Sequence, residues 1–272
     1  MVRMGTVWDR TVEVLNGRTG MIFSIALIGL VIPAFVRDVA ILYSVIASPM
    51  FAFAIASPIL SLVALPFMLW AQLAITAIAT EPGVTRQDAA RQGRARLLPA
   101  LGLTLLLGLV AVIAMLPPIV ALIWSGFDFA SALSEGSASR VSPPSIATVV
   151  FIVLYVLLSA ALAIWLFARL IVLYPVILNE RLGLATISRA FTLTKGLTWR
   201  IIGVLLLFGI VVTIATGAAQ SVTGLIFKLV LGDAGSLLTN GVVTLVSAAF
   251  TVVATVFTAQ LYVAIREKHA VP

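Results

Sequence analysis

Long stretches without a charged residue alternate with short polar segments along most of the chain. The long stretches are residues 19–36, 39–80, 97–127, 141–168 (continuing past Arg169 to residue 179), 201–227 and 234–265. An α-helix needs about 20 residues to cross a hydrocarbon core of about 30 Å, so most of these stretches fit one tilted helix each. The pattern predicts an all-α, polytopic membrane protein with about six transmembrane helices in a single integral membrane domain, residues 1–272.

One stretch, residues 39–80, is long enough for two helices, and Pro49 and Pro58 could bound a turn within it. The basic residues decide between one span and two. With one span, both termini and the segments 81–96 and 179–200 share one side, which holds Arg3, Arg10, Arg18, Arg86, Arg91, Arg94, Arg96, Arg181, Arg189, Lys195, Arg200, Arg266 and Lys268. The other side keeps Arg37, Arg140 and Lys228. Because cytoplasmic loops carry an excess of Lys and Arg, we expect six spans in a bacterial inner membrane, with both termini cytoplasmic.

The amino-acid composition supports the class of membrane protein and argues against several kinds of functional site. Hydrophobic residues make up 62% and charged residues 10% of the 272, with a mean hydropathy of +1.20. A soluble domain carries roughly 25% charged residues and cannot bury so much apolar surface. The chain has no cysteine and one histidine, His269, which argues against thiolate chemistry, metal sites and cofactors. In a membrane protein, the net charge of +7 indicates contact with anionic phospholipids, and we expect no nucleic-acid partner.

The first 18 residues mix Arg3, Asp9, Arg10 and Glu13 with apolar positions. No small-residue cleavage site follows the first apolar stretch, which argues against a signal peptide. We therefore expect residues 1–18 to form an amphipathic helix in the membrane interface. Aromatic residues near the span ends also suit the interface: Trp70, Trp124, Trp165, Trp199 and Tyr262.

Two parts of the chain resemble each other. Residues 85–114 align without gaps on residues 186–215, with matches that include Gly102/Gly203, Gly108/Gly209 and Arg94 opposite Lys195. The alignment is compatible with a parallel duplication, in units 49–127 and 145–231, and also with chance similarity between apolar spans. Many transporters carry their site at the interface of such repeats.

Residues 179–196, "NERLGLATISRAFTLTKG", gather charges and hydroxyl groups between two apolar stretches. In a helix they form a polar stripe of Ser188, Thr192 and Lys195 and an apolar stripe of Leu184, Ile187 and Phe191. Gly196 suits the end of such a helix. This predicts a cytoplasmic amphipathic segment at the inner leaflet, with a second, more basic one at residues 85–96.

Arg169 is the only ionisable residue within the predicted spans. An intramembrane charge is a functional hypothesis, but residues 146–165 already provide a full span. We therefore favour a position at the inner interface, where the side chain reaches the head groups. Proton pumps need buried carboxylates or histidines, and the predicted spans contain none, which argues against an ion-coupled pump.

Two motifs follow Arg169: "YPVILNE" at residues 174–180 and "ATISRAFTLTKG" at residues 185–196. Through these motifs the chain resembles the membrane domain of glycerophosphoryl diester phosphodiesterases and related uncharacterised bacterial inner-membrane proteins. The residues that carry the resemblance are Arg169, Pro175, Glu180, Ala185, Ser188, Leu193, Lys195 and Gly196. It implies the membrane architecture and a link to lipids. It does not imply hydrolysis, because the chain lacks the histidines and the "HRG"-type motif of the family's catalytic barrel.

We expect a non-enzymatic protein of envelope or lipid homeostasis that binds phospholipid head groups or another membrane or envelope protein. The candidate residues are Arg91, Arg94, Arg169, Glu180, Ser188, Arg189 and Lys195. One alternative is a carrier of a lipidic or apolar solute, with a site lined by Gln72, Arg169 or Gln220. An interfacial enzyme using Glu180, Ser188 and Lys195 is disfavoured, because Glu180 and Ser188 would lie roughly 12 Å apart along a helix.

Overall fold

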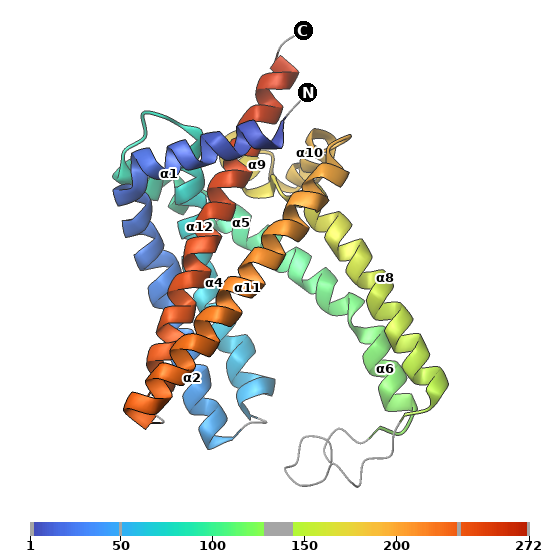
Figure 1. The fold of residues 1–272 in the computed structure, drawn as a ribbon. Helices are drawn as coiled ribbons and strands as arrows, with labels where there is room; N and C mark the ends of the chain where they lie inside the picture. Colours follow the sequence, from blue (N-terminus) through green and yellow to red (C-terminus); the bar gives the residue numbers. More distant parts are fainter. Residues whose placement is uncertain (1–2, 49–50, 128–143, 233–234, 271–272) are drawn as a thin grey trace. The chain divides into compact units, whose positions relative to one another are not determined.

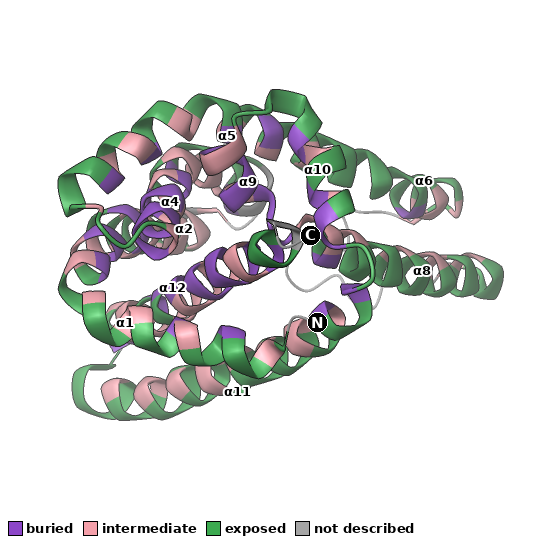
Figure 2. Ribbon diagram, turned by 90° about the horizontal axis from the view of Figure 1, so that it is seen from above, coloured by how far each residue is buried: buried purple, intermediate pink, exposed green. Residues whose placement is uncertain are grey.

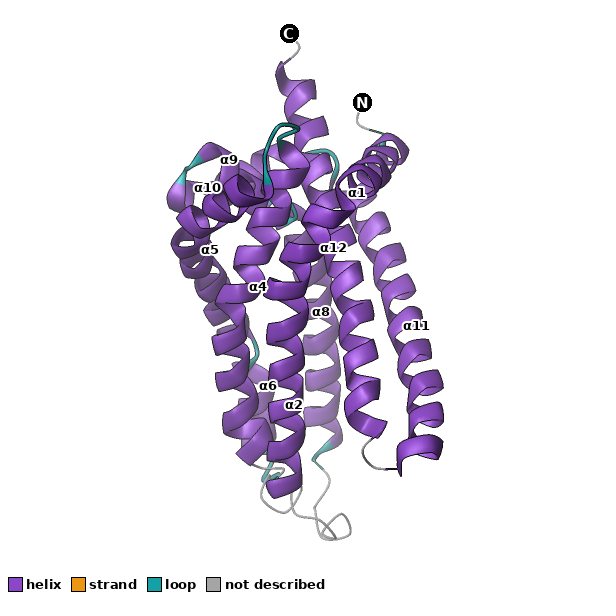
Figure 3. Ribbon diagram, turned by 90° about the vertical axis from the view of Figure 1, so that its left-hand side faces the viewer, coloured by secondary structure: helices purple, strands orange, loops and turns teal. Residues whose placement is uncertain are grey.

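The fold is entirely helical in the part of the chain that the structure describes (Figure 3). This computed structural model describes residues 3–48, 51–127, 144–232 and 235–270. Arg140 and the side chain of His269 fall outside the described residues. The predicted fold class is confirmed: six helical stretches are long and apolar enough to cross a membrane, namely Met4–Ile46, Ser57–Thr80, Arg86–Trp124, Ile146–Glu180, Thr198–Leu231 and Gly235–Lys268.

The chain divides into two compact units, which we describe separately. Unit 1 comprises residues 1–101 and 168–272, and unit 2 comprises residues 102–167. Unit 1 contains α1 (Met4–Ala26), a π-helical turn η1 (Leu27–Val31), α2 (Ile32–Ala47), a second π-helical turn η2 (Ala52–Ala56), α4 (Ser57–Thr80), α9 (Leu173–Glu180), η3 (Gly183–Ala185), α10 (Thr186–Leu193), α11 (Thr198–Leu231) and α12 (Gly235–Ala270). It also contains the beginning of α5 (Arg86–Ala114) and the last residues of α8 (Ile146–Leu170).

Helix α4 is the core of unit 1. It contacts α1, α2, α9 and α12, and its second half from Leu69 to Ala79 is almost completely buried (Figure 2). Small side chains allow this close packing. A Cβ added to Gly29 of η1 would lie 2.5 Å from the Cβ of Ala71, so glycine permits the approach of the two helices.

Unit 2 consists of the end of α5, the short helix α6 (Leu116–Trp124) and most of α8. Pro117 and Pro118 stand in the first turn of α6, where proline is tolerated and breaks the helix from α5. The hydroxyl of Tyr155 donates a hydrogen bond to the Ala114 carbonyl at 2.6 Å, which ties α8 to the end of α5. Large apolar side chains, such as Leu157 and Leu158, are exposed, as expected for surfaces that face lipid.

The first span is longer than the sequence pattern predicts. We expected it to end before Arg37, but helix continues through α2 to Ala47, and Ser48 after it is extended (φ −162°, ψ 107°). The second span is therefore Ser57–Thr80, and residues 39–47 belong to the first. The predicted boundary is wrong because Arg37 and Asp38 neutralise each other at 2.7 Å within the helix. The number of spans agrees with the prediction.

The amphipathic helix predicted over residues 1–18 is present from Met4, and the backbone kinks at Arg18 (φ −132°, ψ 20°). After the kink the chain turns into the first span (Figure 1). The Arg18 guanidinium donates to the carbonyls of Ile78, Glu81 and Pro82, at and beyond the C-terminus of α4. These carbonyls have no partner within the helix, so Arg18 acts as a cap supplied by another helix.

The two segments of the proposed repeat differ locally. Thr85 begins α5, since its hydroxyl accepts a hydrogen bond from the Asp88 N–H, and residues 86–96 form the first turns of that long helix. The second segment is interrupted: α10 ends at Leu193 and α11 begins at Thr198. Gly196 lies in the turn with φ +83°, a conformation that other residues rarely adopt. The duplication itself stays a prediction.

Candidate functional site

The helix segments that carry most of the charged residues of unit 1 lie at the end where α1 begins and α12 ends, which we call the terminal end (Figure 1). Helices α9 and α10 and the beginning of α5 lie there too. Of the described basic residues, the terminal end carries Arg3, Arg10, Arg18, Arg86, Arg91, Arg94, Arg96, Arg181, Arg189, Lys195, Arg200, Arg266 and Lys268. The structure thus brings the two predicted basic segments to one end of the unit.

Glu180, Arg189 and Tyr262 form a hydrogen-bonded network at this end. The Nε of Arg189 donates to one oxygen of the Glu180 carboxylate at 2.7 Å, and the hydroxyl of Tyr262 donates to the other at 3.0 Å. Arg189 is on α10, Glu180 ends α9 and Tyr262 is on α12. Tyr262 is 1% exposed, so its assignment as an interfacial aromatic residue was wrong. The network joins three helices, and its groups are already occupied by one another.

Arg169 lies in the last turn of α8 and contacts α10. Its guanidinium donates to the Phe191 carbonyl at 3.1 Å and stands 5.8 Å from the centre of the Phe191 ring, a cation–π distance. The buried Thr194 hydroxyl donates in turn to the Arg169 carbonyl at 3.2 Å. These contacts fix α10 to the end of α8. The expectation that Arg169 is the only ionisable residue within the spans was wrong, because the first span also contains the paired Arg37 and Asp38.

Helix α10 has the predicted exposed polar face. Ser188, Thr192 and Lys195 are all exposed, whereas the buried face consists of Thr186, Ala190, Leu193, Thr194 and Leu197. The apolar stripe that we predicted is displaced, because Leu184 precedes the helix in η3 and is 71% exposed. The Ser188 hydroxyl donates to the Ala185 carbonyl at 2.9 Å. Ser188 and Glu180 therefore each have other partners.

The basic segment of α5 packs on α4 through its first turns. The Trp70 indole N–H donates to the Ala90 carbonyl at 3.1 Å, and the Arg94 guanidinium stands 5.9 Å from the centre of the Trp70 ring. Arg91 is exposed and lines a pocket of about 470 Å³ together with Glu81 and Asp88. Arg91 and Arg94 thus face outward on a segment that Trp70 holds in place.

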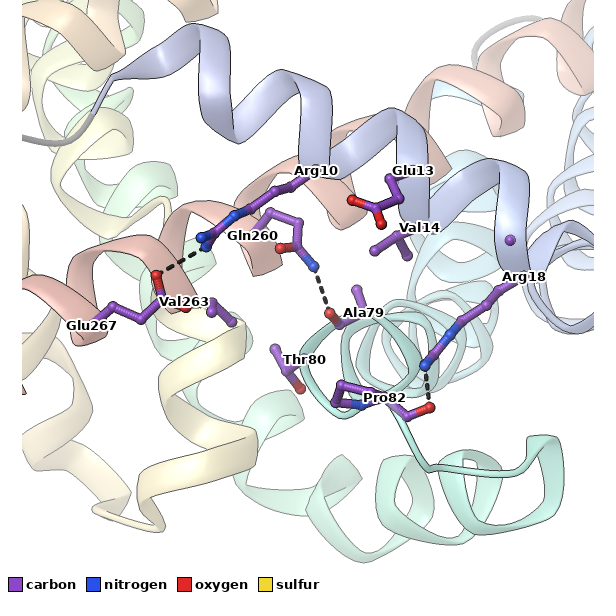
Figure 4. Close-up of a pocket in the computed structure, with 11 residues that line it drawn as sticks. Arg10, Glu13, Val14, Arg18, Ala79, Thr80, Pro82, Gln260, Val263 and Glu267 are labelled. Carbon is purple, nitrogen blue, oxygen red and sulfur yellow. Dashed lines mark hydrogen bonds and ion pairs between the residues drawn. The ribbon is translucent and has the colours of Figure 1, made fainter.

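A second pocket, of about 450 Å³, opens between α1, α4 and α12 (Figure 4). Its polar wall comprises Arg10 and Glu13 of α1, Gln260 and Glu267 of α12, and Arg18 at the kink. Arg10 pairs with Glu267 at 2.9 Å, and the Gln260 amide donates to the Ala79 carbonyl at 2.6 Å. The hydrogen bond from Gln260 joins α12 to α4.

The sequence reasoning did not single out Glu13, Gln260, Tyr262 or Glu267 as site residues. A signal for the pocket exists: Arg10, Glu13 and Gly17 are spaced as one face of a helix, and so are Gln260, Val263 and Glu267. The fact that these two faces meet follows only from tertiary structure, because they are about 250 residues apart (257 between Arg10 and Glu267).

Comparisons with protein-family models, with curated proteins and with solved structures found no match to this chain. The resemblance to the membrane domain of glycerophosphoryl diester phosphodiesterases therefore stays a prediction, whose distinctive motif runs from Arg169 to Gly196. The structure shows a polytopic helical membrane protein with a strongly basic terminal end.

Proposed function

We propose that the protein is a non-enzymatic component of the bacterial inner membrane that binds anionic phospholipid head groups at its terminal end. The observation that carries the proposal is the exposure of Arg91, Arg94 and Lys195 at the end that holds most of the basic residues. Each Lys or Arg near an anionic membrane surface contributes about 1 kcal/mol of attraction. On this proposal the terminal end is cytoplasmic, and the role lies in envelope or lipid homeostasis.

The seven candidate residues divide into two groups. Arg169, Glu180 and Arg189 interact with neighbouring helices, so we assign them to positioning α9 and α10. The exposed group, Arg91, Arg94, Ser188 and Lys195, can reach a ligand. Trp199, which is 83% exposed just after the turn at Gly196, suits insertion into the same interface.

Binding is measured with spin-labelled lipids in nanodiscs, as the association of phosphatidylglycerol relative to phosphatidylcholine. We expect the variant with Arg91→Ala, Arg94→Ala and Lys195→Ala to lose most of the preference for phosphatidylglycerol. Loss of about 1 kcal/mol per side chain corresponds to a factor of about five each. An unchanged preference would refute the proposal.

A matched pair of single variants tests where the binding occurs. Lys195 and Lys228 are both exposed lysines, but Lys228 lies near the end of α11, away from the terminal end. We expect Lys195→Ala to weaken the phosphatidylglycerol preference and Lys228→Ala to leave it nearly unchanged. Equal effects would show that binding is not concentrated at the basic segments.

The carrier hypothesis gains no support from the described pockets. The three pockets adjoin residues 10–18, residues 80–92 and residues 178–181, and none is lined by Gln72, Arg169 or Gln220. Gln220 is exposed on α11, and Gln72 lies on α4. We therefore propose head-group binding in preference to transport.

A further inference from the structure

The pocket between α1, α4 and α12 combines positive and negative groups within one small volume. Arg10 and Glu13 project from α1, while Glu267 projects from α12 toward Arg10 (Figure 4). The volume of about 450 Å³ lies within the range of about 300–1,000 Å³ that is usual for small-molecule sites. A purely anionic ligand would be repelled by Glu13 and Glu267, and a purely cationic ligand would be repelled by Arg10. The pocket therefore favours a zwitterion.

The ion pair inside the pocket can exchange partners at little cost. The side chains of Arg10 and Glu267 are 40% and 57% exposed, and an ion pair of this kind contributes only about 0–1 kcal/mol. A zwitterion replaces this one pair by two, with its anion on Arg10 and its cation on Glu267. Arg10 provides the forked donor geometry that suits a phosphate.

The other groups of the pocket favour a cation that can donate hydrogen bonds. Glu13 is exposed and makes no hydrogen bond or ion pair with any described residue. Arg18 is already engaged by the three carbonyls near the end of α4, which leaves Arg10 as the donor for the anion. Two carboxylates, Glu13 and Glu267, thus line the space for the cation.

We propose that this pocket binds a zwitterion with a primary ammonium and a phosphate joined by a short linker, the head-group chemistry of phosphatidylethanolamine. The phosphate contacts Arg10, and the ammonium donates to Glu13 and Glu267. A choline head group fits less well: its quaternary ammonium donates no hydrogen bond and needs an aromatic cage, whereas no aromatic side chain is among the described residues lining the pocket.

This site is separate from the basic segments of α5 and α10, and its ligand carries no net charge. Its test therefore uses only zwitterionic lipids, and the outcome is independent of anionic-lipid binding. The purified protein is placed in nanodiscs with equal amounts of phosphatidylethanolamine and phosphatidylcholine. Native mass spectrometry then measures the lipids that stay bound.

We expect the native protein to retain phosphatidylethanolamine over phosphatidylcholine by about tenfold, the effect of one charge-assisted hydrogen bond. Glu13→Gln removes a negative charge that attracts the ammonium and leaves a weaker, neutral acceptor, so it is expected to reduce this ratio severalfold. Asp9→Asn is the matched control, because Asp9 is an exposed carboxylate of α1 outside the pocket lining, and it should leave the ratio unchanged. An unchanged thermal midpoint for both variants confirms that the fold is intact.

Equal retention of the two lipids by the native protein overturns the proposal, as does equal loss of selectivity in Glu13→Gln and Asp9→Asn. Soluble phosphoethanolamine carries the same ammonium and phosphate as the lipid head group. Adding it therefore shows whether the pocket binds the free compound or the phospholipid. If millimolar phosphoethanolamine displaces the bound lipid in native protein but not in Glu13→Gln, the pocket accepts the free compound. If the lipid stays bound with the same selectivity, the ligand is the phospholipid itself.

Discussion

The hydroxyl of Tyr262 donates a hydrogen bond to the carboxylate of Glu180 at 3.0 Å, across 82 positions of sequence. The second carboxylate oxygen accepts from Arg189 at 2.7 Å. Tyr262 is buried on α12, and the charge of Glu180 at the end of α9 is balanced by Arg189 of α10. A carboxylate with partners on two other helices fixes the position of the segment that carries Ser188 and Lys195.

Removing the Tyr262 hydroxyl should destabilise unit 1 without changing its packing. Tyr262→Phe keeps the ring and loses one hydrogen bond to a charged acceptor, so we expect a loss of about 1.5 kcal/mol. Denaturant unfolding in detergent micelles measures the change. Tyr43→Phe is the control, because Tyr43 is 60% exposed and makes no hydrogen bond with the described residues. Similar unfolding midpoints for the two variants would contradict the assigned role.

Arg18 should stabilise the loop that follows α4. Arg18→Ala removes the donors for the carbonyls of Ile78, Glu81 and Pro82, and we expect a loss of about 1–3 kcal/mol. Limited proteolysis near residues 82–85 should become faster. Arg3→Ala removes an exposed arginine from the same helix and should leave the cleavage rate unchanged.

Gly29 should be intolerant of even a methyl group. The added Cβ of Gly29→Ala would lie 2.5 Å from the Cβ of Ala71, and overpacking of this kind costs about 1–3 kcal/mol. Gly20→Ala, on the preceding helix, meets no atom within 4 Å and should be neutral or slightly stabilising. The difference between the two unfolding midpoints tests the close approach of η1 and α4. A neutral Gly29→Ala would rule that contact out.

Arg37 and Asp38 of α2 should each be tolerated in the span only because the other neutralises its charge. The Thr244 hydroxyl of α12 also donates to Asp38, at 3.2 Å. Asp38→Ala leaves Arg37 unpaired within a span, at a cost on the order of 2–3 kcal/mol. The double variant Arg37→Ala and Asp38→Ala should recover much of the folded yield from membranes. If the double variant is as poor as Asp38→Ala alone, the pair does not compensate its own charges.

The sequence was sufficient for the features that depend on local pattern. The apolar stretches, together with the distribution of basic residues, predicted the number of spans. The amphipathic N-terminus predicted a helix that ends at Arg18, and Gly196 predicted the break before α11. The last two features depend on residues that are close together in the chain.

One local feature was missed: a charged residue normally marks the end of a span, but Arg37 and the adjacent Asp38 cancel each other and the helix continues. The other missed features depend on partners distant in sequence. A tyrosine near a span end normally lies in the interface, but Tyr262 is buried because Glu180 of α9 offers an acceptor. The pocket beside α1 was missed for the same reason, since its walls come from both ends of the chain.

The contact of α1 with α12 also sets the order of assembly. Arg10 and Glu267 pair across 257 positions, so the ribosome releases the amphipathic helix long before its partner exists. Until α12 is inserted, the face of α1 that packs on α12 lacks this partner, and we expect membrane proteases to act on this nascent intermediate. Truncations within α12 should therefore shorten the cellular lifetime of the protein even when all the earlier spans insert normally.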